Sequence, residues 1–145
     1  MVFKNKTVFI TGGSRGIGLE IAKKLASNGA NISIASKTTD PHEKLPGTIF
    51  SAAKEIELAG GKCLPLKCDI RSEEQLKKAI DATVAEFGGI DFCINNASAI
   101  SPLPTAETTM KKFDLMHEIN VRGTFLATKL CLPFLKKSSH AHILT

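Results

Sequence analysis

Apolar residues along the chain follow two alternating patterns. Short apolar runs bounded by turn residues predict strands, and longer stretches with an apolar residue every three or four positions predict helices. The strands are expected at residues 7–10, 31–35, 62–67, 91–94 and from residue 142 onward. The helices are expected from residue 17, across residues 49–56, from residue 72 and, as one long element, across residues 106–136.

Turn and capping residues mark the ends of several of these elements. Ser72 followed by Gln75 has the spacing of a capping box, which begins a helix by reciprocal hydrogen bonds between side chains and main chain. Glycine pairs at 60–61 and 88–89 end two helices, and residues 38–47, with two prolines, form a loop.

The order of these elements predicts the fold class. Strands that alternate with helices at this spacing form a parallel sheet with right-handed crossovers. We therefore predict a doubly wound α/β fold, Rossmann-like, in one domain that spans residues 1–145.

A glycine-rich segment joins the first predicted strand to the first predicted helix. Gly12, Gly16 and Gly18 follow the spacing G-x-x-x-G-x-G, which is neither the G-x-G-x-x-G turn nor a P-loop. A strand, a glycine turn and a helix N-terminus together hold the pyrophosphate of a dinucleotide, because main-chain N–H groups approach the phosphates closely. The alternative is a glycine-rich turn without a ligand. The predicted cofactor-binding residues of this segment are Thr11, Gly12, Gly13, Ser14, Arg15, Gly16, Ile17 and Gly18.

Composition narrows the classes of protein that remain. Apolar residues make up 43% of the chain and charged residues 23%, as in a globular protein, and no apolar run is long enough to span a membrane. The start of the chain lacks the basic and apolar segments of a signal peptide, so an intracellular protein is expected. The four cysteines show neither C-x-x-C spacing nor a disulfide framework, and we expect them to be reduced and mostly buried.

Neither a metal site nor nucleic-acid binding is expected. His140 and His142 can share one face of a strand, but no third ligand lies nearby in the sequence. The net charge of +5 comes with lysine pairs on helix-patterned stretches that have no aromatic platform between them. Solvated helix faces explain these lysines, and the positive potential would still attract a phosphate-rich ligand.

Four motifs in order resemble those of the short-chain dehydrogenase/reductase family. They are the glycine turn at 11–18, Asp69-Ile70 after the third strand, Asn95-Asn96-Ala97 after the fourth, and Asn120 in the long helix. The resemblance implies the strand order 3-2-1-4-5, with Asp69 accepting from the adenine amino group and Asn95 lining the cofactor through its main chain. The residues alone also allow Asp69 to cap or tether the following loop, and Asn96 to fix the sheet without touching a ligand.

The residues after the second strand favour NADP over NAD. An NAD site places a carboxylate about 20 residues past the glycine turn, where it binds the ribose 2′-OH and would repel a 2′-phosphate. This chain has Ala35-Ser36-Lys37 there, and Arg15 beside the turn could reach the same phosphate. Asp40 lies a little later and could bend back. NADP is therefore the expected cofactor, with Lys37 among its ligands.

The chain lacks most of the catalytic residues that the resemblance implies. The family transfers a hydride on a carbonyl or alcohol with a tyrosine, a lysine four residues on, a serine and an asparagine. The sequence contains no tyrosine, and only Asn120 matches a member of that set. The expected protein is thus the amino-terminal half of an NADP-dependent oxidoreductase, truncated before the Ser/Tyr/Lys segment and inactive alone. The alternatives are a non-catalytic NADP-binding or interaction module and, for Asn120, a helix kink or a main-chain tether.

The resemblance also bears on association, substrate and location. The long helix at residues 106–136 packs on its counterpart in many family members, which implies a homodimer or another association through it. Segments at 35–38, 96–101 and 141–144 are similar to a peroxisomal, NADP-dependent member, which implies a peroxisomal location and a lipid or steroid-like substrate. The final four residues, 142–145, are not a peroxisomal signal.

Overall fold

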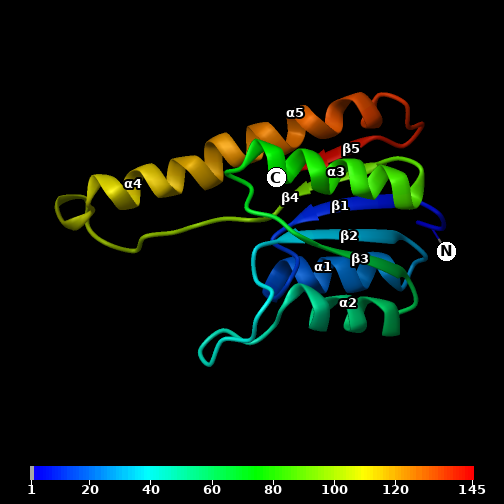
Figure 1. The fold of residues 1–145 in the computed structure, drawn as a ribbon, viewed down its shortest axis with the longest axis horizontal. Helices are drawn as coiled ribbons and strands as arrows, with labels where there is room; N and C mark the ends of the chain where they lie inside the picture. Colours follow the sequence, from blue (N-terminus) through cyan, green and yellow to red (C-terminus); the bar gives the residue numbers. More distant parts are fainter. Residues whose placement is uncertain (1) are drawn as a thin grey trace.

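Five parallel strands form the centre of the molecule in the computed structural model, which describes residues 2–145 (Figure 1). The strands are β1 (Thr7–Thr11), β2 (Asn31–Ser36), β3 (Lys62–Lys67), β4 (Phe92–Asn95) and β5 (His142–Leu144). Their order in the sheet is β3-β2-β1-β4-β5, so the predicted strand order and the Rossmann-like α/β fold are confirmed. Every predicted strand is present, and β4 begins and ends one residue later than expected.

Helices cover both faces of this sheet, as Figure 1 shows. One face carries α1 (Gly16–Ala26) and α2 (Ile49–Leu58), and the other carries α3 (Glu73–Phe87) and α5 (Thr124–Leu135). All residues of β1 are buried, because this strand is central in the sheet and helices pack on both of its faces. Val8 and Ile10 belong to the apolar cluster with α1 and α2, whereas Phe9 belongs to the cluster with α3 and α5. The alternation of side chains along one strand thus supplies both halves of the core.

The prediction of one long α-helix across residues 106–136 is wrong in its start and its continuity. A 3-10 turn (η1, Thr105–Glu107) comes first, α4 (Met110–His117) follows, and a π-helical segment (η2, Glu118–Gly123) joins α4 to α5. The start is set by Thr109, whose hydroxyl accepts a main-chain N–H of the first turn at 3.3 Å. Apolar periodicity continues through the π-segment, so the sequence pattern does not reveal it.

The start of α3 corrects a second prediction. The hydroxyl of Ser72 accepts the Gln75 N–H at 3.3 Å, so Ser72 caps the helix as expected. The Gln75 side chain does not complete the capping box, because its Oε1 accepts the Asp69 N–H at 2.9 Å instead. Gln75 therefore fixes the loop between β3 and α3 rather than the first turn of the helix.

The structure also locates the cysteines. Cys68, Cys93 and Cys131 are buried, and Cys63 is partly buried, which agrees with the predicted burial. Across residues 2–145, no helix is long and apolar enough to cross a membrane. In the part of the chain that the structure describes, no three potential metal ligands come together.

Candidate functional site

The glycine turn lies at the carboxyl end of β1 and leads into α1. Gly12 has a φ of +73° and Gly16 a φ of +56°, which is the left-handed conformation that residues with side chains rarely adopt. A Cβ atom at Gly12 would lie 2.8 Å from the Cα atom of Ala97. The turn therefore needs glycine at position 12 both for its conformation and for its close approach to the loop after β4.

Two polar side chains hold the glycine turn in place. The side-chain amide of Asn96 donates to the main-chain oxygens of Thr11 and Gly12, at 3.1 and 3.0 Å. In return, the Thr11 hydroxyl accepts the N–H groups of Asn96 and Ala97, both at 3.1 Å. Thr11 is buried, so its side chain joins the turn to the loop after β4. Asn96 therefore shapes the site, a role that the sequence left open.

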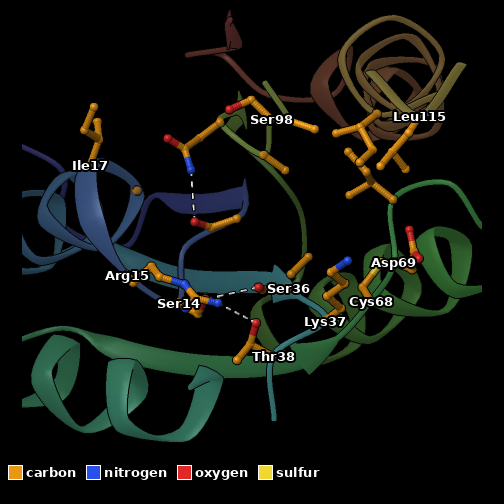
Figure 2. A pocket seen from close by; sticks show the side chains of 18 residues that line it. Ser14, Arg15, Ile17, Ser36, Lys37, Thr38, Cys68, Asp69, Ser98 and Leu115 are labelled. Carbon is orange, nitrogen blue, oxygen red and sulfur yellow. Dashed lines mark hydrogen bonds between the residues drawn. The ribbon is translucent and has the colours of Figure 1, made fainter. Parts of the chain in front are cut away.

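A cavity of about 500 Å³ opens beside this turn (Figure 2). It lies where the winding of the sheet reverses between β1 and β4, and open α/β sheets bind ligands at such a switch point. The loop after β4 and the helical segment from α4 onward form the wall opposite the end of β2. The predicted site residues that line the cavity are Gly12, Ser14, Arg15, Ile17, Gly18, Lys37 and Asp69.

Positive charge and hydroxyl groups gather at the end of β2. Lys37 and Thr38 line the cavity there, and Arg15 donates to the Thr38 hydroxyl at 2.8 Å. Arg15 also donates to a main-chain oxygen of the following loop at 2.9 Å. The hydroxyls of Ser14 and Ser36 lie 3.2 Å apart in the same corner. This corner therefore presents two cations and three hydroxyls, with Arg15 held by the loop after β2.

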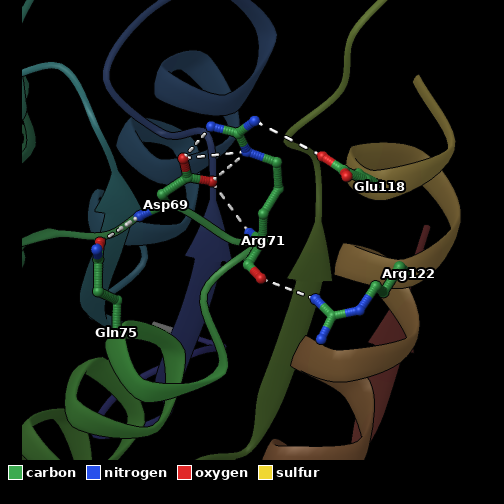
Figure 3. Close-up of polar contacts among 5 residues, drawn as sticks. All are labelled: Asp69, Arg71, Gln75, Glu118 and Arg122. Atoms are coloured by element: carbon green, nitrogen blue, oxygen red, sulfur yellow. Dashed lines mark hydrogen bonds and ion pairs between the residues drawn. The ribbon is translucent and has the colours of Figure 1, made fainter. Parts of the chain in front are cut away.

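Asp69 lines the cavity near Lys37 and pairs with Arg71 (Figure 3). Nε of Arg71 donates to both carboxylate oxygens, at 3.0 and 3.1 Å, and Nη2 donates to one of them at 2.6 Å. These hydrogen bonds lower the pKa of the Asp69 carboxyl, so the group is ionised at neutral pH and only accepts hydrogen bonds. The carboxylate also accepts the Arg71 N–H at 3.0 Å, so Asp69 tethers its own loop.

Apolar side chains accompany Asp69 in the cavity lining. They come from the loop after β3, which gives Cys68 and Ile70, and from the helical segment opposite, which gives Leu115 and Ile119. Burial raises the pKa of the Cys68 thiol to about 12, so this side chain is an uncharged, apolar part of the wall at neutral pH. An apolar part of a cavity wall next to a carboxylate suits an aromatic group that carries a hydrogen-bond donor.

Some predicted site residues do not line the cavity, namely Thr11, Gly13, Gly16, Asn95 and Asn120. A Cβ atom at Gly13 would lie 2.7 Å from the side chain of Ile34, so this glycine serves the packing of the turn on β2. The amide of Asn95 donates to the Thr128 hydroxyl of α5 at 3.0 Å, so this side chain binds α5.

Asn120 lies within the π-segment and binds the loop after β4. Its amide donates to the main-chain oxygen of Ala99 at 2.8 Å, and its side-chain oxygen accepts the Ala99 N–H at 2.9 Å. This reciprocal pair is the main-chain tether that the residue alone allowed. Ala99 and Ile119, the residue before Asn120, both line the cavity. Asn120 therefore joins the loop after β4 to the π-segment beside the cavity.

Several residues that line the cavity were not predicted from the sequence, although the position of some of them in the sequence indicates the site. Ser36 and Thr38 flank Lys37 at the end of β2, so their position beside a predicted ligand indicates the site. Leu115 and Ile119 gave no such signal, because their spacing of four residues is that of an ordinary core stripe. Only the folded arrangement shows that this stripe faces a cavity.

Comparison with known proteins agrees with this architecture. Residues 6–145 match the family model described as short chain dehydrogenase. The chain belongs to the short-chain dehydrogenase family. The family assignment implied by the four sequence motifs is thereby confirmed.

The chain spans only about a third of the length of the curated relatives that it matches. Hydroxysteroid dehydrogenase-like protein 2 from Xenopus laevis is 60% identical over 138 residues, which are 95% of this chain and 33% of that protein. A solved short-chain dehydrogenase from Mycobacterium thermoresistibile is 52% identical, with a TM-score of 0.94, over 97% of this chain and 50% of that one. A solved NADH-dependent reductase in complex with NAD is 28% identical, with a TM-score of 0.82, over 95% of this chain and 55% of that one.

Proposed function

We propose that this short-chain dehydrogenase binds NADP(H) and is the cofactor-binding part of an oxidoreductase that acts on a carbonyl or an alcohol. The observation that carries the proposal is the cavity at the switch point of the sheet, where the glycine turn, Lys37 and Asp69 come together. The cofactor would supply or accept the hydride, and the residues of this chain would bind and orient it.

The glycine turn and α1 suit the pyrophosphate. The first main-chain N–H groups of α1 have no partner within the helix, and the helix dipole adds partial positive charge at the same end. No acidic residue lies in the first turn of α1, so nothing there opposes an anion. Ser14 adds a hydroxyl in the cavity lining.

The corner at the end of β2 suits a 2′-phosphate. Lys37 supplies a cation, Arg15 a second one, and Ser36 and Thr38 supply hydroxyl donors. Asp40 does not line the cavity, and its carboxylate accepts from the Thr39 hydroxyl at 2.9 Å. The solved relative that holds NAD supports a nicotinamide dinucleotide as the class of ligand, and this corner supports the phosphorylated form.

The adenine end would lie against the apolar part of the cavity wall beside Asp69. The ionised carboxylate can accept a hydrogen bond from the 6-amino group, while Ile70, Leu115 and Ile119 offer apolar contact to the ring. Asn95 does not line this cavity, so the cavity gives no support for the main-chain contact that the family resemblance implies for it.

Catalysis would need residues that this chain does not contain. Proton transfer by a positioned side chain is worth about 10²–10⁴-fold in rate, and the sequence has no tyrosine to provide it. Asn120 is the matching member of the family's catalytic set, and its side chain is bound to Ala99. The 145-residue chain alone is therefore proposed to bind cofactor without turnover. The second candidate is a non-catalytic NADP-binding module, and it concerns the 145-residue chain by itself, which has no tyrosine.

Exposed apolar side chains support association through the helical segment at residues 110–135. Met110, Val121 and Phe125 are each more than 60% exposed, at 66%, 61% and 67%. Pairing with a second copy or with another subunit through this surface is part of the proposal. Similarity to Hydroxysteroid dehydrogenase-like protein 2 further suggests a peroxisomal location and a lipid or steroid-like substrate.

A fluorescence titration with NADPH and NADH tests the proposal directly. We expect saturable binding of NADPH, weaker binding of NADH, and no NADPH oxidation when ketones are added to the chain alone. Failure to bind either dinucleotide would overturn the proposal. A longer chain that includes the Ser/Tyr/Lys segment separates the two candidates, because turnover is expected for the oxidoreductase and not for the module.

A further inference from the structure

Asp69 lies in the wall between two cavities. One is the proposed dinucleotide cavity, and the other is a smaller polar cavity of about 370 Å³ lined by Asp69, Arg71, Ser72, Gln75, Glu118 and Arg122. Arg71 lines only the second cavity. The Arg71 guanidinium therefore holds the Asp69 carboxylate from the second cavity. Figure 3 shows its contacts with that carboxylate and with Glu118.

The loop that carries Asp69 is fixed at several of its atoms. Arg71 binds both carboxylate oxygens through a planar fork, a geometry that sets the orientation of a carboxylate as well as its position. The main-chain N–H of Asp69 donates to Gln75 Oε1 at 2.9 Å, so the main chain at this residue is held by α3. Both contacts are made within the protein, so they hold Asp69 in place without a bound dinucleotide.

The same arginine also connects this loop to the π-segment across the second cavity. Its Nη1 lies 3.7 Å from Oε2 of Glu118, the first residue of that segment. Arg122 donates to the Arg71 main-chain oxygen at 2.8 Å, and Gly123 packs so closely on Ile70 that a Cβ atom would lie 2.7 Å from its Cδ1. The loop after β3 and the π-segment that carries Asn120 are therefore bound to each other. Arg71 takes part in two of these contacts, one through its guanidinium and one through its main-chain oxygen.

We infer that Arg71 is a positioning residue for purine recognition: it orients the Asp69 carboxylate toward the 6-amino group of the adenine and locks that carboxylate to the π-segment. The inference rests on the proposed function, since it concerns the same cavity. Without the fork the carboxylate keeps only the main-chain N–H of residue 71, which binds one of its two oxygens. The second oxygen is then no longer fixed, so the hydrogen bond of the carboxylate to a purine amino group would lose directional preference. Arg71 thus acts on base selectivity without touching the base.

The test compares NADPH with its 6-unsubstituted purine analogue, in which a hydrogen atom replaces the 6-amino group of the base, so that the donor is removed and no new donor is added. Wild-type chain is expected to bind NADPH about tenfold more tightly than the analogue, as for one hydrogen bond to an ionised acceptor. Arg71→Met is expected to reduce this ratio to about twofold, and Arg71→Lys to an intermediate value because lysine keeps the charge without the fork. A purely structural effect of Arg71 would weaken both ligands equally and leave the ratio unchanged.

A matched control comes from α3, where Lys78 and Glu74 form an ion pair with the same 2.6 Å separation. Lys78→Met removes that pair outside both cavities and is expected to leave the ratio at its wild-type value. Thermal melting of each variant checks that it is folded, and Arg71→Lys carries the test if Arg71→Met does not fold.

Each outcome has a defined meaning. A reduced ratio in the Arg71 variants with an unchanged ratio in Lys78→Met supports the inference. An unchanged ratio overturns it, and an increased ratio also overturns it because Arg71 would then compete with the base for Asp69. If wild-type chain binds neither dinucleotide, the proposed function fails as well, and this is visible before any variant is made.

Discussion

The side-chain amide of Asn96 occupies the position that a Cβ atom of Gly18 would need. The same Cβ would lie 2.7 Å from the main-chain oxygen of Gly12, an atom that already accepts a hydrogen bond from Asn96. Three segments therefore meet at Gly18, namely the glycine turn, the first turn of α1 and the loop after β4. The absence of a side chain at this position allows all three to come together.

Gly18→Ala is expected to lower the free energy of unfolding by about 1–3 kcal/mol, because the neighbours of the new methyl group are held by main-chain contacts. NADPH binding should weaken with it, since the glycine turn must shift. Denaturant unfolding and an NADPH titration measure the two effects. Gly89→Ala is the control, because a Cβ atom there has no neighbour within 4 Å. Equal effects of the two substitutions would contradict the packing argument.

Thr11→Val tests the link between the glycine turn and the loop after β4. Valine has nearly the same shape but no acceptor, so the N–H groups of Asn96 and Ala97 both lose their partner. Each unsatisfied donor costs about 1–3 kcal/mol when it is shielded from water. Unfolding experiments and NADPH titrations should both show a loss.

The matched control for Thr11 is Thr83→Val in α3. Thr83 is equally buried, but its hydroxyl donates to the main-chain oxygen of Ala79, which keeps its helical partner after the substitution. We expect a smaller loss of stability and unchanged NADPH binding. Weaker NADPH binding in Thr83→Val would show that the affinity follows overall stability instead of the geometry of the turn.

Lys37→Asp is expected to reverse the cofactor preference. Loss of a charge-assisted hydrogen bond to the 2′-phosphate should weaken NADPH binding about 10–100-fold, while the new carboxylate can accept from the ribose 2′-OH of NADH. Titrations with both dinucleotides give the ratio of affinities. Lys4→Asp makes the same charge change in the turn before β1 and should leave the ratio unaltered. An unaltered ratio in Lys37→Asp would remove Lys37 from the proposed phosphate site.

The Asp69–Arg71 pair should contribute to stability in a pH-dependent way. Because Arg71 lowers the pKa of the Asp69 carboxyl in the folded state, its contribution is complete above the unfolded-state pKa of about 3.9. The contribution is lost as the pH falls through the lower pKa of the folded state. Asp69→Asn removes it, so wild type and variant should differ by about 0.5–1 kcal/mol at pH 7 and converge in acid. Urea unfolding of both proteins between pH 7 and pH 3 measures the difference, and a constant difference would contradict the argument.

The thiols of the folded chain should resist alkylation. Burial raises the pKa of Cys63 and of Cys68 to about 12, and only the thiolate is nucleophilic. Iodoacetamide at pH 8 is therefore expected to modify Cys63 and Cys68 slowly in the folded chain and all four cysteines after denaturation. Peptide mass spectrometry identifies the modified residues. Rapid modification of Cys68 in the folded chain would show that the adenine end of the cavity opens to solvent.

The sequence by itself determined the sheet and the place of the candidate cavity. Apolar runs such as 7–10 and 31–35 and the glycine spacing are local properties, because strand period, turn conformation and helix start depend on residues close in the chain. The strand order and the location of the candidate site followed from these signals through the family resemblance. The start of α4 and the partner of Gln75 were predicted wrongly, since each depends on competing hydrogen-bond partners.

The tertiary structure alone decided which side chains meet. Asn120 pairs with Ala99, 21 residues earlier, and Arg122 pairs with Arg71, 51 residues earlier. Such pairs have no sequence period, because they form only when the loops after β3 and β4 are brought to the same edge of the sheet and the π-segment lies across them. Local patterning therefore predicts where the cavity is, whereas the packing of distant segments determines which residues shape its walls.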